Sequence, residues 1–260
     1  MAGRLTTIFS KLSGCYYVTR NIFQSLCFAF RLGRKKKIVI RINNNLIHLR
    51  KNETDQAVFN STFLEKYHRS PVDLGPSPVI VDLGSNIGLT MVDFKQNYPS
   101  ARIIGVEMDK DNFDLCNMNI SGLTGCTLIH AAVWNENGYI NYKGIDEQSY
   151  AIEKESFGNS GLVRCMTMDR LFKENNILEV DYINMDIEGA EKALLLESPT
   201  KTWLKQVKYL SIEVHDWIGT ENKFLVKNLK TELEANEFIV FKSAIHISSL
   251  FAINKLLISS

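Results

Sequence analysis

The stretch VIVDLGSNIGLTMVDF, residues 79–94, joins an apolar run to a glycine-containing loop and the start of a helix. The run 79–83 has the length and composition of a buried strand, although it contains one carboxylate, Asp82. The loop 84–88 must turn sharply and let a ligand approach, which its glycines permit, and Asn86 tolerates positive φ better than most residues. This order of strand, glycine loop and helix predicts a ligand-binding turn at the carboxyl end of a buried strand.

Strand-like and helical segments alternate from residue 78 onward. Near-continuous apolar runs are typical of strands buried on both faces, and their alternation with helices predicts right-handed crossovers and parallel pairing. Two more strand-like runs at the end predict an antiparallel pair at the sheet edge. The sequence therefore predicts an α/β fold with a doubly wound, mainly parallel seven-stranded sheet. Strands are expected at 79–83, 102–107, 127–133, 180–185, 207–214, 237–242 and 247–257, and helices at about 88–97, 110–120, 189–196 and 221–235.

The first 70 residues have a different pattern, and we predict that they form a small helical and hairpin extension before a main domain at 71–260. Residues 1–33 have helical character. The segment KIVIRINNNLIHL then alternates on either side of three asparagines, as a β-hairpin does. Residues 54–67 follow at helical spacing, with Thr54 as the expected N-cap.

Acidic and basic side chains nearly cancel, with 29 Asp and Glu against 30 Lys and Arg, so no overall field attracts nucleic acid. The cations at 34–37 are a local exception. A basic amphipathic segment can rest on an anionic membrane. The same segment can equally pack on its own domain, with its lysines solvated. Both interpretations stay open at this point.

The cysteines bear on the compartment of the protein. The five cysteines are widely scattered and never in C-x-x-C spacing, which argues against a disulfide framework and a zinc site. No uninterrupted run of about 18 apolar residues is present, so a membrane-spanning helix is not expected. We therefore expect a cytoplasmic protein, with attachment to the inner face of a membrane through the basic segment as the alternative. Association into a homo-oligomer is a further open alternative.

A long polar connection, residues 135–161, lies between the third and fourth predicted strands of the main domain. Its glycines at 138, 144, 158 and 161 are expected to break any regular element. Connections this long within a compact domain are often lids or binding loops. A disordered surface insertion is the alternative.

The glycine loop favours one class of cofactor. It fits the dinucleotide pattern G-x-G-x-x-G poorly, because Asn86 and Leu89 stand where the second and third glycines are needed. Glu107 closes the next predicted strand, where a carboxylate can accept hydrogen bonds from both ribose hydroxyls. Asp82 would repel a diphosphate, but it can attract an ammonium group or steady the glycine loop. Together these features favour S-adenosylmethionine over NAD.

Five longer segments occur in this order: VIVDLGSNIGLT, IIGVEMDKDNFDLCNMNI, LIHAAVW, DYINMDIEGAE and LSIEVH. Together they resemble the FkbM family of S-adenosylmethionine-dependent methyltransferases, over roughly residues 36–216. The resemblance implies a class I methyltransferase (Rossmann-like) fold and methylation of hydroxyl oxygens, often on sugars or polyketide-type metabolites and frequently in bacterial polysaccharide biosynthesis. Many members carry an acidic residue followed by proline after the second strand, whereas here Met108 follows Glu107.

We predict that the cofactor contacts come from the turns after the first three strands. Adenine needs a flat apolar slot, and the segment 130–134 follows the third strand, with small Ala132 permitting close approach. Trp134 in that segment can equally belong to the core. The candidate cofactor-binding residues are Asp82, Gly84, Ser85, Asn86, Gly88, Glu107, Met108 and Ala132.

A hydroxyl oxygen is a poor nucleophile until its proton is removed, so a base close to the acceptor is expected. Asp186 closes the fourth strand and His215 the fifth, and we predict that one of them accepts this proton. Glu188 and Glu213 would orient the acceptor or the base, although Glu188 has an alternative structural role at a helix start. A divalent metal held by Asp186, Glu213 and His215 is an alternative with suitable ligand types, but no metal site is predicted.

The sequence thus predicts an S-adenosylmethionine-dependent O-methyltransferase that acts on a hydroxyl of a sugar, a glycan or a related small molecule. Methylases of nucleic-acid bases usually carry a D/N-P-P-Y/F turn after the fourth strand, where this chain has MDIE, so no nucleic-acid partner is expected. Two alternatives stay open. One is a non-catalytic module that binds the adenosyl cofactor, and the other is a methyltransferase with a lipid or nucleic-acid acceptor.

Overall fold

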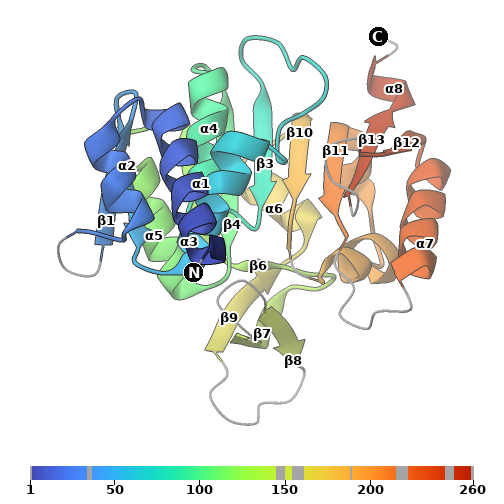
Figure 1. The fold of residues 1–260 in the computed structure, drawn as a ribbon. Helices are drawn as coiled ribbons and strands as arrows, with labels where there is room; N and C mark the ends of the chain where they lie inside the picture. Colours follow the sequence, from blue (N-terminus) through green and yellow to red (C-terminus); the bar gives the residue numbers. More distant parts are fainter. Residues whose placement is uncertain are drawn as a thin grey trace.

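The computed structural model describes residues 2–33, 37–144, 150–153, 161–187, 189–214, 222–243 and 249–258. A seven-stranded sheet forms its centre, in the order β12-β13-β11-β10-β3-β4-β5 (Figure 1). β13 is antiparallel to both of its neighbours, and all other pairs are parallel, which confirms the predicted doubly wound sheet. The strands are β3 (Val79–Leu83), β4 (Arg102–Glu107), β5 (Cys126–His130), β10 (Val180–Met185), β11 (Val207–Glu213), β12 (Phe238–Lys242) and β13 (Ser249–Asn254).

The strand order reverses between β3 and β10. The chain runs outward from β3 to β4 and β5, and then returns to place β10 on the other side of β3. The register pairs Asp82 with Asn184 and Leu83 with Met185, so the two strands end side by side. In open α/β sheets, a crevice at the carboxyl ends of such strands is where ligands bind. The fold therefore directs attention to the turns after β3, β4 and β10.

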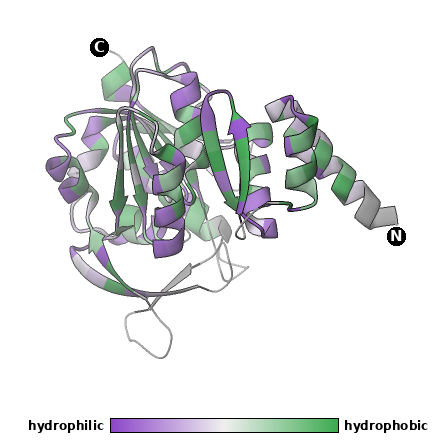
Figure 2. Cartoon of the chain, turned by 90° about the vertical axis from the view of Figure 1, so that its left-hand side faces the viewer, coloured by the Kyte–Doolittle hydropathy of each residue, from purple (hydrophilic) through white to green (hydrophobic). Residues whose placement is uncertain are grey.

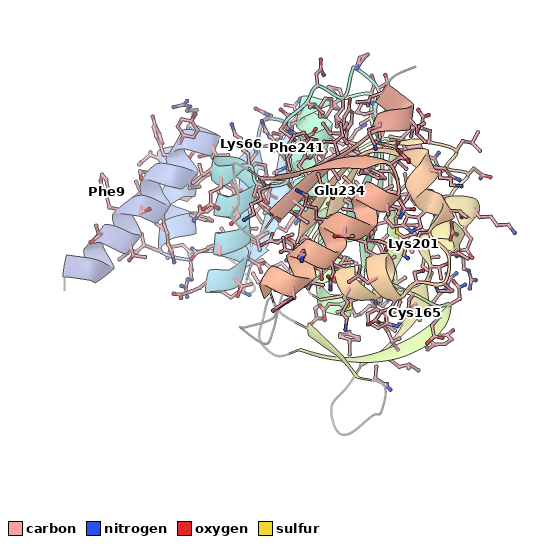
Figure 3. All side chains as sticks on the ribbon, turned by 90° about the vertical axis from the view of Figure 1, so that its right-hand side faces the viewer. Phe9, Lys66, Cys165, Lys201, Glu234 and Phe241 are labelled. Carbon is pink, nitrogen blue, oxygen red and sulfur yellow. The ribbon has the colours of Figure 1, made fainter. Side chains whose placement is uncertain are left out.

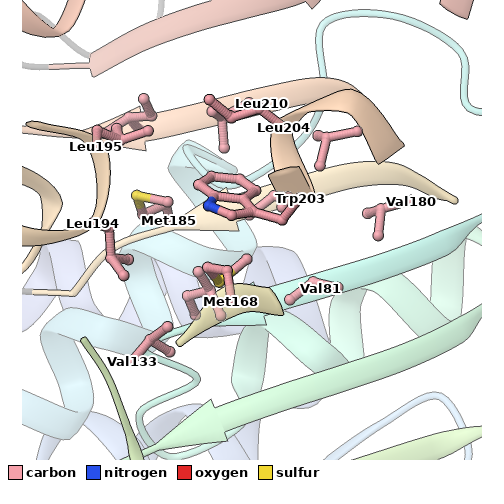
Figure 4. Packing of buried hydrophobic residues seen from close by; sticks show 14 of the residues in the cluster. Val81, Val133, Met168, Val180, Met185, Leu194, Leu195, Trp203, Leu204 and Leu210 are labelled. Carbon is pink, nitrogen blue, oxygen red and sulfur yellow. The ribbon is translucent and has the colours of Figure 1, made fainter. Parts of the chain in front are cut away.

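Two hydrophobic clusters cover the two faces of the sheet, because successive residues of each strand point to opposite faces. Val81 and Leu83 of β3 belong to one cluster, which α6 (Met168–Glu174) and η3 (Thr202–Gln206) help to close. Trp203, in this cluster, is 1% exposed. Figure 4 shows its indole ring close to Met185, Leu204 and Met168. The remaining helices that follow strands are α4 (Leu89–Asn97), α5 (Lys110–Ile120) and α7 (Asn222–Ala235).

The N-terminal extension contains two helices, a hairpin and a third helix, as predicted. The strands β1 and β2 pair in register around the turn at Asn43, whose φ is +53°. The expected N-cap at Thr54 is wrong, because Asn52 has extended φ and its side chain accepts from the Asp55 amide. The elements are α1 (Ala2–Thr19), α2 (Ile22–Ala29), β1 (Lys37–Ile42), β2 (Asn45–Arg50), α3 (Glu53–Asn60) and the π-helical turn η1 (Ser61–Glu65).

The extension shares its core with the second face of the main sheet. Cys15 and Phe28 are fully buried, and they belong to the same cluster as Ile80 of β3 and Tyr182 of β10. In Figure 2 the hairpin and the helices lie beside the main sheet, and the N-terminal end of α1 projects away from the rest of the chain. The division of the chain at residue 70 stays a prediction.

A second sheet differs from what the sequence led us to expect. The stretch 127–133 is not one strand, since β5 ends at His130 and a separate β6 (Ala132–Val133) pairs with β9 (Gly161–Met166). β7 (Gly138–Gly144) and β8 (Tyr150–Glu153) complete a four-stranded sheet in the order β6-β9-β7-β8, which lies below the main sheet in Figure 1. The glycines at 138, 144 and 161 therefore lie at the ends of strands and do not interrupt them. Gly158 lies outside the described residues.

The side chains of β7 explain this difference. Tyr139 is 70% exposed, whereas Ile140 and Tyr142 pack against the cluster of Val163 and Cys165, as the period of two in a strand requires. Gly161 lies opposite Tyr142, and a Cβ at that position would lie 2.7 Å from the Tyr142 ring. In the part of this connection that the structure describes, aromatic side chains therefore help to pair the strands.

Two smaller corrections concern helix and strand ends. The helix expected at 189–196 is mainly a π-helical turn, η2 (Ala193–Glu197), which buries Ala193, Leu194 and Leu195. The last strand ends at Asn254 and not at residue 257, and a short helix, α8 (Lys255–Ile258), follows it. The Asn254 side chain accepts from the Leu256 amide, which stabilises this change of direction.

Candidate active site

The glycine loop after β3 is held directly against the end of β10. The amide of Asp186 donates to the Leu83 carbonyl at 3.0 Å, which extends the pairing of the two strands by one residue. Gly84 has φ +80°, and a Cβ there would lie 1.8 Å from the Asp186 carbonyl oxygen. No larger residue fits this position without moving Asp186. The loop and the candidate base are therefore one structural unit.

Asp82 lies beneath the loop and is fully buried. Its carboxylate accepts from the Thr90 hydroxyl at 2.5 Å and from the Asn184 side-chain amide at 2.8 Å. Burial raises the pKa of Asp82, and these hydrogen bonds oppose that rise. Asp82 is expected either to attract an ammonium group or to steady the glycine loop. The geometry matches the second role, because the carboxylate joins β3 to α4 and β10 on either side of the loop.

Ser85, Asn86 and Gly88 shape the loop from within. The Ser85 hydroxyl donates to the Asp82 carbonyl at 2.9 Å. Asn86 has φ +47°, so the loop uses the tolerance for positive φ that the sequence indicated. A Cβ on Gly88 would lie 2.6 Å from Cys116 Sγ, so glycine here lets α4 begin close to α5.

Glu107 joins the turns after β3 and β4. Its Oε2 accepts from the Asn86 amide at 2.8 Å, and its Oε1 accepts from the Asp109 amide at 2.7 Å. The side chain is 5% exposed, and burial raises its pKa to about 7 against these hydrogen bonds. A carboxylate offers about four acceptor positions, so this one retains capacity for ribose hydroxyls. The residue thus fits the ribose of an adenosyl cofactor.

An apolar cluster brings together Ala132 and Met108, two of the predicted cofactor-binding residues. Ala132 is buried in it, and Met108 packs against it from the turn after β4. The Met108 carbonyl oxygen lies 3.0 Å from His130 Nε2. The cluster is completed by side chains of β7, β9 and the turn after β6, namely Ile140, Tyr142, Val163, Cys165 and Trp134. These side chains offer the apolar wall that an adenine ring needs.

Asp186 follows β10 and is partly buried at the carboxyl edge of the sheet. The Tyr67 hydroxyl donates to its Oδ2 at 3.4 Å. Desolvation, and then the carboxylates of Asp186 and Asp82, raise the pKa of Tyr67 well above its ordinary value. Tyr67 therefore stays neutral, and in this pair Asp186 accepts the hydrogen bond.

The segment that carries Tyr67 is fixed by its neighbours. His68 Nε2 lies 2.9 Å from an Asp93 carboxylate oxygen on α4, and Arg69 donates two hydrogen bonds of 2.7 Å to the same carboxylate. The Tyr182 hydroxyl donates to the His68 carbonyl at 2.9 Å. These contacts hold residues 67–69 against both α4 and β10.

The other candidate catalytic residues are less defined. Glu213 is the last residue of β11, is partly buried, and is near enough to Tyr67 to raise its pKa. Glu188 and His215 lie outside the described residues. Among the residues that the structure does describe, no group of three His, Cys, Asp or Glu side chains is arranged to hold a metal ion.

A cavity of about 230 Å³ opens beside Tyr67, between the N-terminal extension and the last two strands of the sheet. Figure 3 shows the strand that bears Phe241 close to Lys66, the residue before Tyr67. The cavity wall contains aromatic rings, a hydroxyl group and cations, contributed by Tyr67, Phe241, Phe251, Ser211, Arg69 and Lys242. The cavity thus adjoins the residue that binds Asp186.

Sequence reasoning missed three polar partners in this region. Tyr67 comes from the extension, 119 positions before Asp186, and no pattern in the sequence links the two. Asn184 stands inside an apolar strand, and a polar residue in such a run is the one signal that points to a buried partner. Thr90 lies in the first turn of α4, eight positions after Asp82.

A strand-order switch with a glycine loop after one strand and a ribose-type carboxylate after the next is the arrangement with which Rossmann-like proteins bind a nucleoside-containing cofactor. One family model, described as the methyltransferase FkbM domain, matches residues 82–240. The chain belongs to this family. The class I methyltransferase fold and the S-adenosylmethionine cofactor expected from the motifs are thereby confirmed.

Individual relatives and solved structures share only a small part of the sequence with this chain. The chain is 27% identical over 174 residues to the 2-O-methyltransferase NoeI of Sinorhizobium fredii, which covers 58% of this chain and 72% of NoeI. Among solved structures, Aeropyrum pernix fibrillarin with bound S-adenosyl-L-methionine is 11% identical, with a TM-score of 0.45 over 85% of this chain and 84% of its own. The M. capricolum TrmK complex with S-adenosyl-homocysteine is 16% identical, with a TM-score of 0.38 over 69% of this chain and 62% of its own. The family match, and not these structural similarities, assigns the chain.

The raised pKa of Glu107 predicts a pH-dependent cofactor affinity. Ribose hydroxyls donate to the carboxylate form, so binding of S-adenosylhomocysteine should weaken by up to about tenfold per pH unit below about pH 7. The stability of the unliganded protein has the opposite trend. A folded pKa above the ordinary 4.5 means that this group stabilises the fold at low pH, and that this contribution is lost as the pH rises from about 4.5 to about 7.

Titration calorimetry between about pH 5 and about pH 8 would test this. Glu107→Gln should bind the ligand more weakly at neutral pH and should lose most of the pH slope. Glu174→Gln, which changes an exposed carboxylate on α6, is the control. It should keep the affinity at neutral pH and the pH slope. An unchanged slope in Glu107→Gln would show that another group is responsible.

Proposed function

We propose that the chain transfers a methyl group from S-adenosylmethionine to a hydroxyl oxygen of a sugar, a glycan or a related metabolite. The observation that carries this proposal is the pairing of Asp186 with Tyr67 at the carboxyl edge, beside the residues that suit the cofactor. Similarity to a 2-O-methyltransferase supports oxygen as the methylated atom. The bound cofactor supplies an electrophilic methyl group, and the chain must supply alignment and a base.

Asp186 is proposed as that base. Its backbone is fixed to β3 through the Leu83 carbonyl, and its carboxylate is oriented by Tyr67. A neutral tyrosine donates a hydrogen bond without competing for the substrate proton. Asp186 would therefore accept the proton of the acceptor hydroxyl, while Tyr67 positions the carboxylate. His215 remains the second candidate for the base.

The cavity beside Tyr67 is proposed as the acceptor site. Phe241 and Phe251 offer aromatic faces, of the kind against which the C–H groups of a sugar ring can pack, and Ser211 offers a hydroxyl. The ring of Tyr209 stacks on Phe251 with the centroids 6.1 Å apart, which supports that wall. A ring bound here would lie next to Tyr67 and so within reach of the Asp186 end of the crevice.

The proposal is tested by incubating the full chain with isotopically labelled S-adenosylmethionine and a panel of nucleotide sugars, oligosaccharides and methyl glycosides. Mass spectrometry should find one label-bearing methyl ether on a sugar hydroxyl. Transfer to nitrogen or to a carboxylate would contradict O-methylation. Tight binding of S-adenosylhomocysteine, without transfer to any acceptor in sugar, lipid and RNA panels, would favour the non-catalytic module.

Phe241→Ala should affect acceptor binding selectively. Loss of one aromatic face should raise the KM for the methylated sugar by about tenfold. The kcat and the affinity for S-adenosylhomocysteine should stay near those of the original chain, because Phe241 is distant from the glycine loop in the sheet order. Ile239→Ala is the matched control, since Ile239 is two positions earlier on the same strand and 43% exposed but not part of the cavity wall. An equal rise in KM in both variants would mean that this cavity is not the acceptor site.

A further inference from the structure

The formal charge of +1 conceals a strong asymmetry along the chain. The first 52 residues contain eleven Lys and Arg residues and no Asp or Glu. The remaining 208 residues therefore hold nineteen Lys and Arg against all 29 acidic residues. Net charges of +11 and −10 in two parts of one chain create local potentials that the total does not reveal. The positive part comprises α1, α2, the β1–β2 hairpin and residues 34–36, which lie outside the described residues.

The same part exposes large apolar side chains. Phe9 and Phe23 are 71% and 72% exposed, and Tyr17, Ile22 and Leu32 are each more than half exposed. Scattered single apolar residues are normal on protein surfaces, but a cluster of this kind within two adjacent helices marks an interaction surface. We call Phe9, Tyr16, Tyr17, Ile22, Phe23, Phe30 and Leu32 the N-terminal apolar surface.

Helical geometry gathers these side chains on outward faces. Phe9 and Tyr16, seven positions apart, share one stripe of α1, while Cys15 on another face is buried. The Arg20 guanidinium lies 5.1 Å from the centre of the Tyr17 ring, so a cation and an aromatic ring occur together. Figure 3 shows Phe9 on α1, far from the main sheet and on the outer side of the helix.

We propose that the N-terminal apolar surface binds the interface of an anionic lipid bilayer. Aromatic and aliphatic side chains would enter the headgroup boundary, and the surrounding Lys and Arg residues would pair with anionic lipids. Charge complementarity favours this occupant over a symmetric contact with the same surface of a second copy, which has the same positive sign. Aromatic rings can also stack on nucleic-acid bases, but the aliphatic side chains of Ile22 and Leu32 suit the headgroup boundary and not a base. Within the described residues no helix is both long and apolar enough to cross a membrane, so the contact would be peripheral.

Co-sedimentation with vesicles tests this proposal on the full chain. The probe is vesicles of phosphatidylcholine with phosphatidylglycerol, compared with pure phosphatidylcholine. Binding should be strong only to the anionic vesicles, and it should weaken with added salt. Phe9→Ser combined with Phe23→Ser should lower the partition coefficient by about tenfold or more. Leu178→Ser combined with Phe224→Ser, at 88% and 70% exposed positions elsewhere in the chain, is the control and should leave it unchanged.

A second pair of variants tests the charge. Arg20→Gln combined with Arg41→Gln should weaken binding to anionic vesicles by about tenfold, since each cation near such a surface contributes on the order of 1 kcal/mol. Lys173→Gln combined with Lys205→Gln, two exposed cations in the acidic part of the chain, is the matched control. Equal binding to neutral vesicles, or full binding by the Phe9 and Phe23 variant, would overturn the proposal.

Two further outcomes would also overturn the proposal. One is binding to RNA but not to vesicles, and the other is a change in self-association, measured by light scattering, as the main effect of the Phe9 and Phe23 variant. Titration with S-adenosylhomocysteine should be unchanged in all four variants. Because that titration reports the cofactor site alone, failure of membrane binding and failure of methyl transfer can be told apart.

Discussion

Asp186→Asn should lower kcat by roughly a hundred- to ten-thousand-fold, because an amide cannot accept the proton of the acceptor hydroxyl. Asparagine keeps the size of the side chain, the backbone hydrogen bond to Leu83 and an oxygen that can accept from Tyr67. The affinity for S-adenosylhomocysteine should therefore stay near that of the original chain. Single-turnover kinetics with the labelled cofactor, together with calorimetric titration, would measure both quantities.

The matched control lies on the same strand. Asp181, at the opposite end of β10, accepts from the Val79 amide and from Lys208, so Asp181→Asn should change stability and leave kcat largely intact. Asp186→Ala should have the same low kcat as Asp186→Asn. If Asp186→Asn retains full turnover, Asp186 is not the base and His215 becomes the leading candidate.

Gly84→Ala should destabilise the fold and damage the site together. A Cβ at this position would collide with the Asp186 carbonyl oxygen at 1.8 Å, and both atoms belong to backbone that cannot rotate away. The collision and the left-handed φ of +80° should together cost about 2–5 kcal/mol. For a chain of this size, that corresponds to a fall in melting temperature on the order of 10 °C. Binding of S-adenosylhomocysteine should weaken in the same variant, because the loop must shift.

Gly75→Ala separates the two causes. Gly75 has φ +78°, almost the same backbone conformation, but a Cβ there would meet no atom within 4 Å. This control should cost only the conformational part, about 1–2 kcal/mol, and should leave cofactor binding unchanged. Thermal melting followed by circular dichroism would compare the two variants. Equal losses would mean that the contact between Gly84 and Asp186 is not what restricts residue 84 to glycine.

The main sheet could be predicted from the sequence because its strands are buried on both faces. Runs such as 79–83 and 180–185 are mainly apolar, and that signal is independent of their partners. The second sheet has no such signal, since β7 mixes polar and apolar residues and begins and ends with glycine. Its order comes from tertiary contacts, such as Tyr142 over Gly161, which a local pattern does not contain.

The sequence points to candidate site residues for a related reason. A carboxylate at the end of an apolar strand, as at Glu107, is visible in the sequence because the polar residue interrupts a regular pattern. What the sequence did not reveal is which of these side chains face the crevice and which lie beneath it. Asp82 and Glu107 have similar settings in the sequence, yet Asp82 is sealed under the loop by Asn184, a residue 102 positions away.

The position of Tyr67 has a consequence for engineering within the family. The shared family match begins at residue 82, whereas Tyr67 and Arg69 precede it and line the cavity with Phe241 and Phe251. Grafting only the matched portion of one relative onto another would therefore transfer Ser211 and Asp186 but leave these four cavity residues with the recipient. Chimeras intended to exchange substrate preference should carry both terminal regions from the same donor.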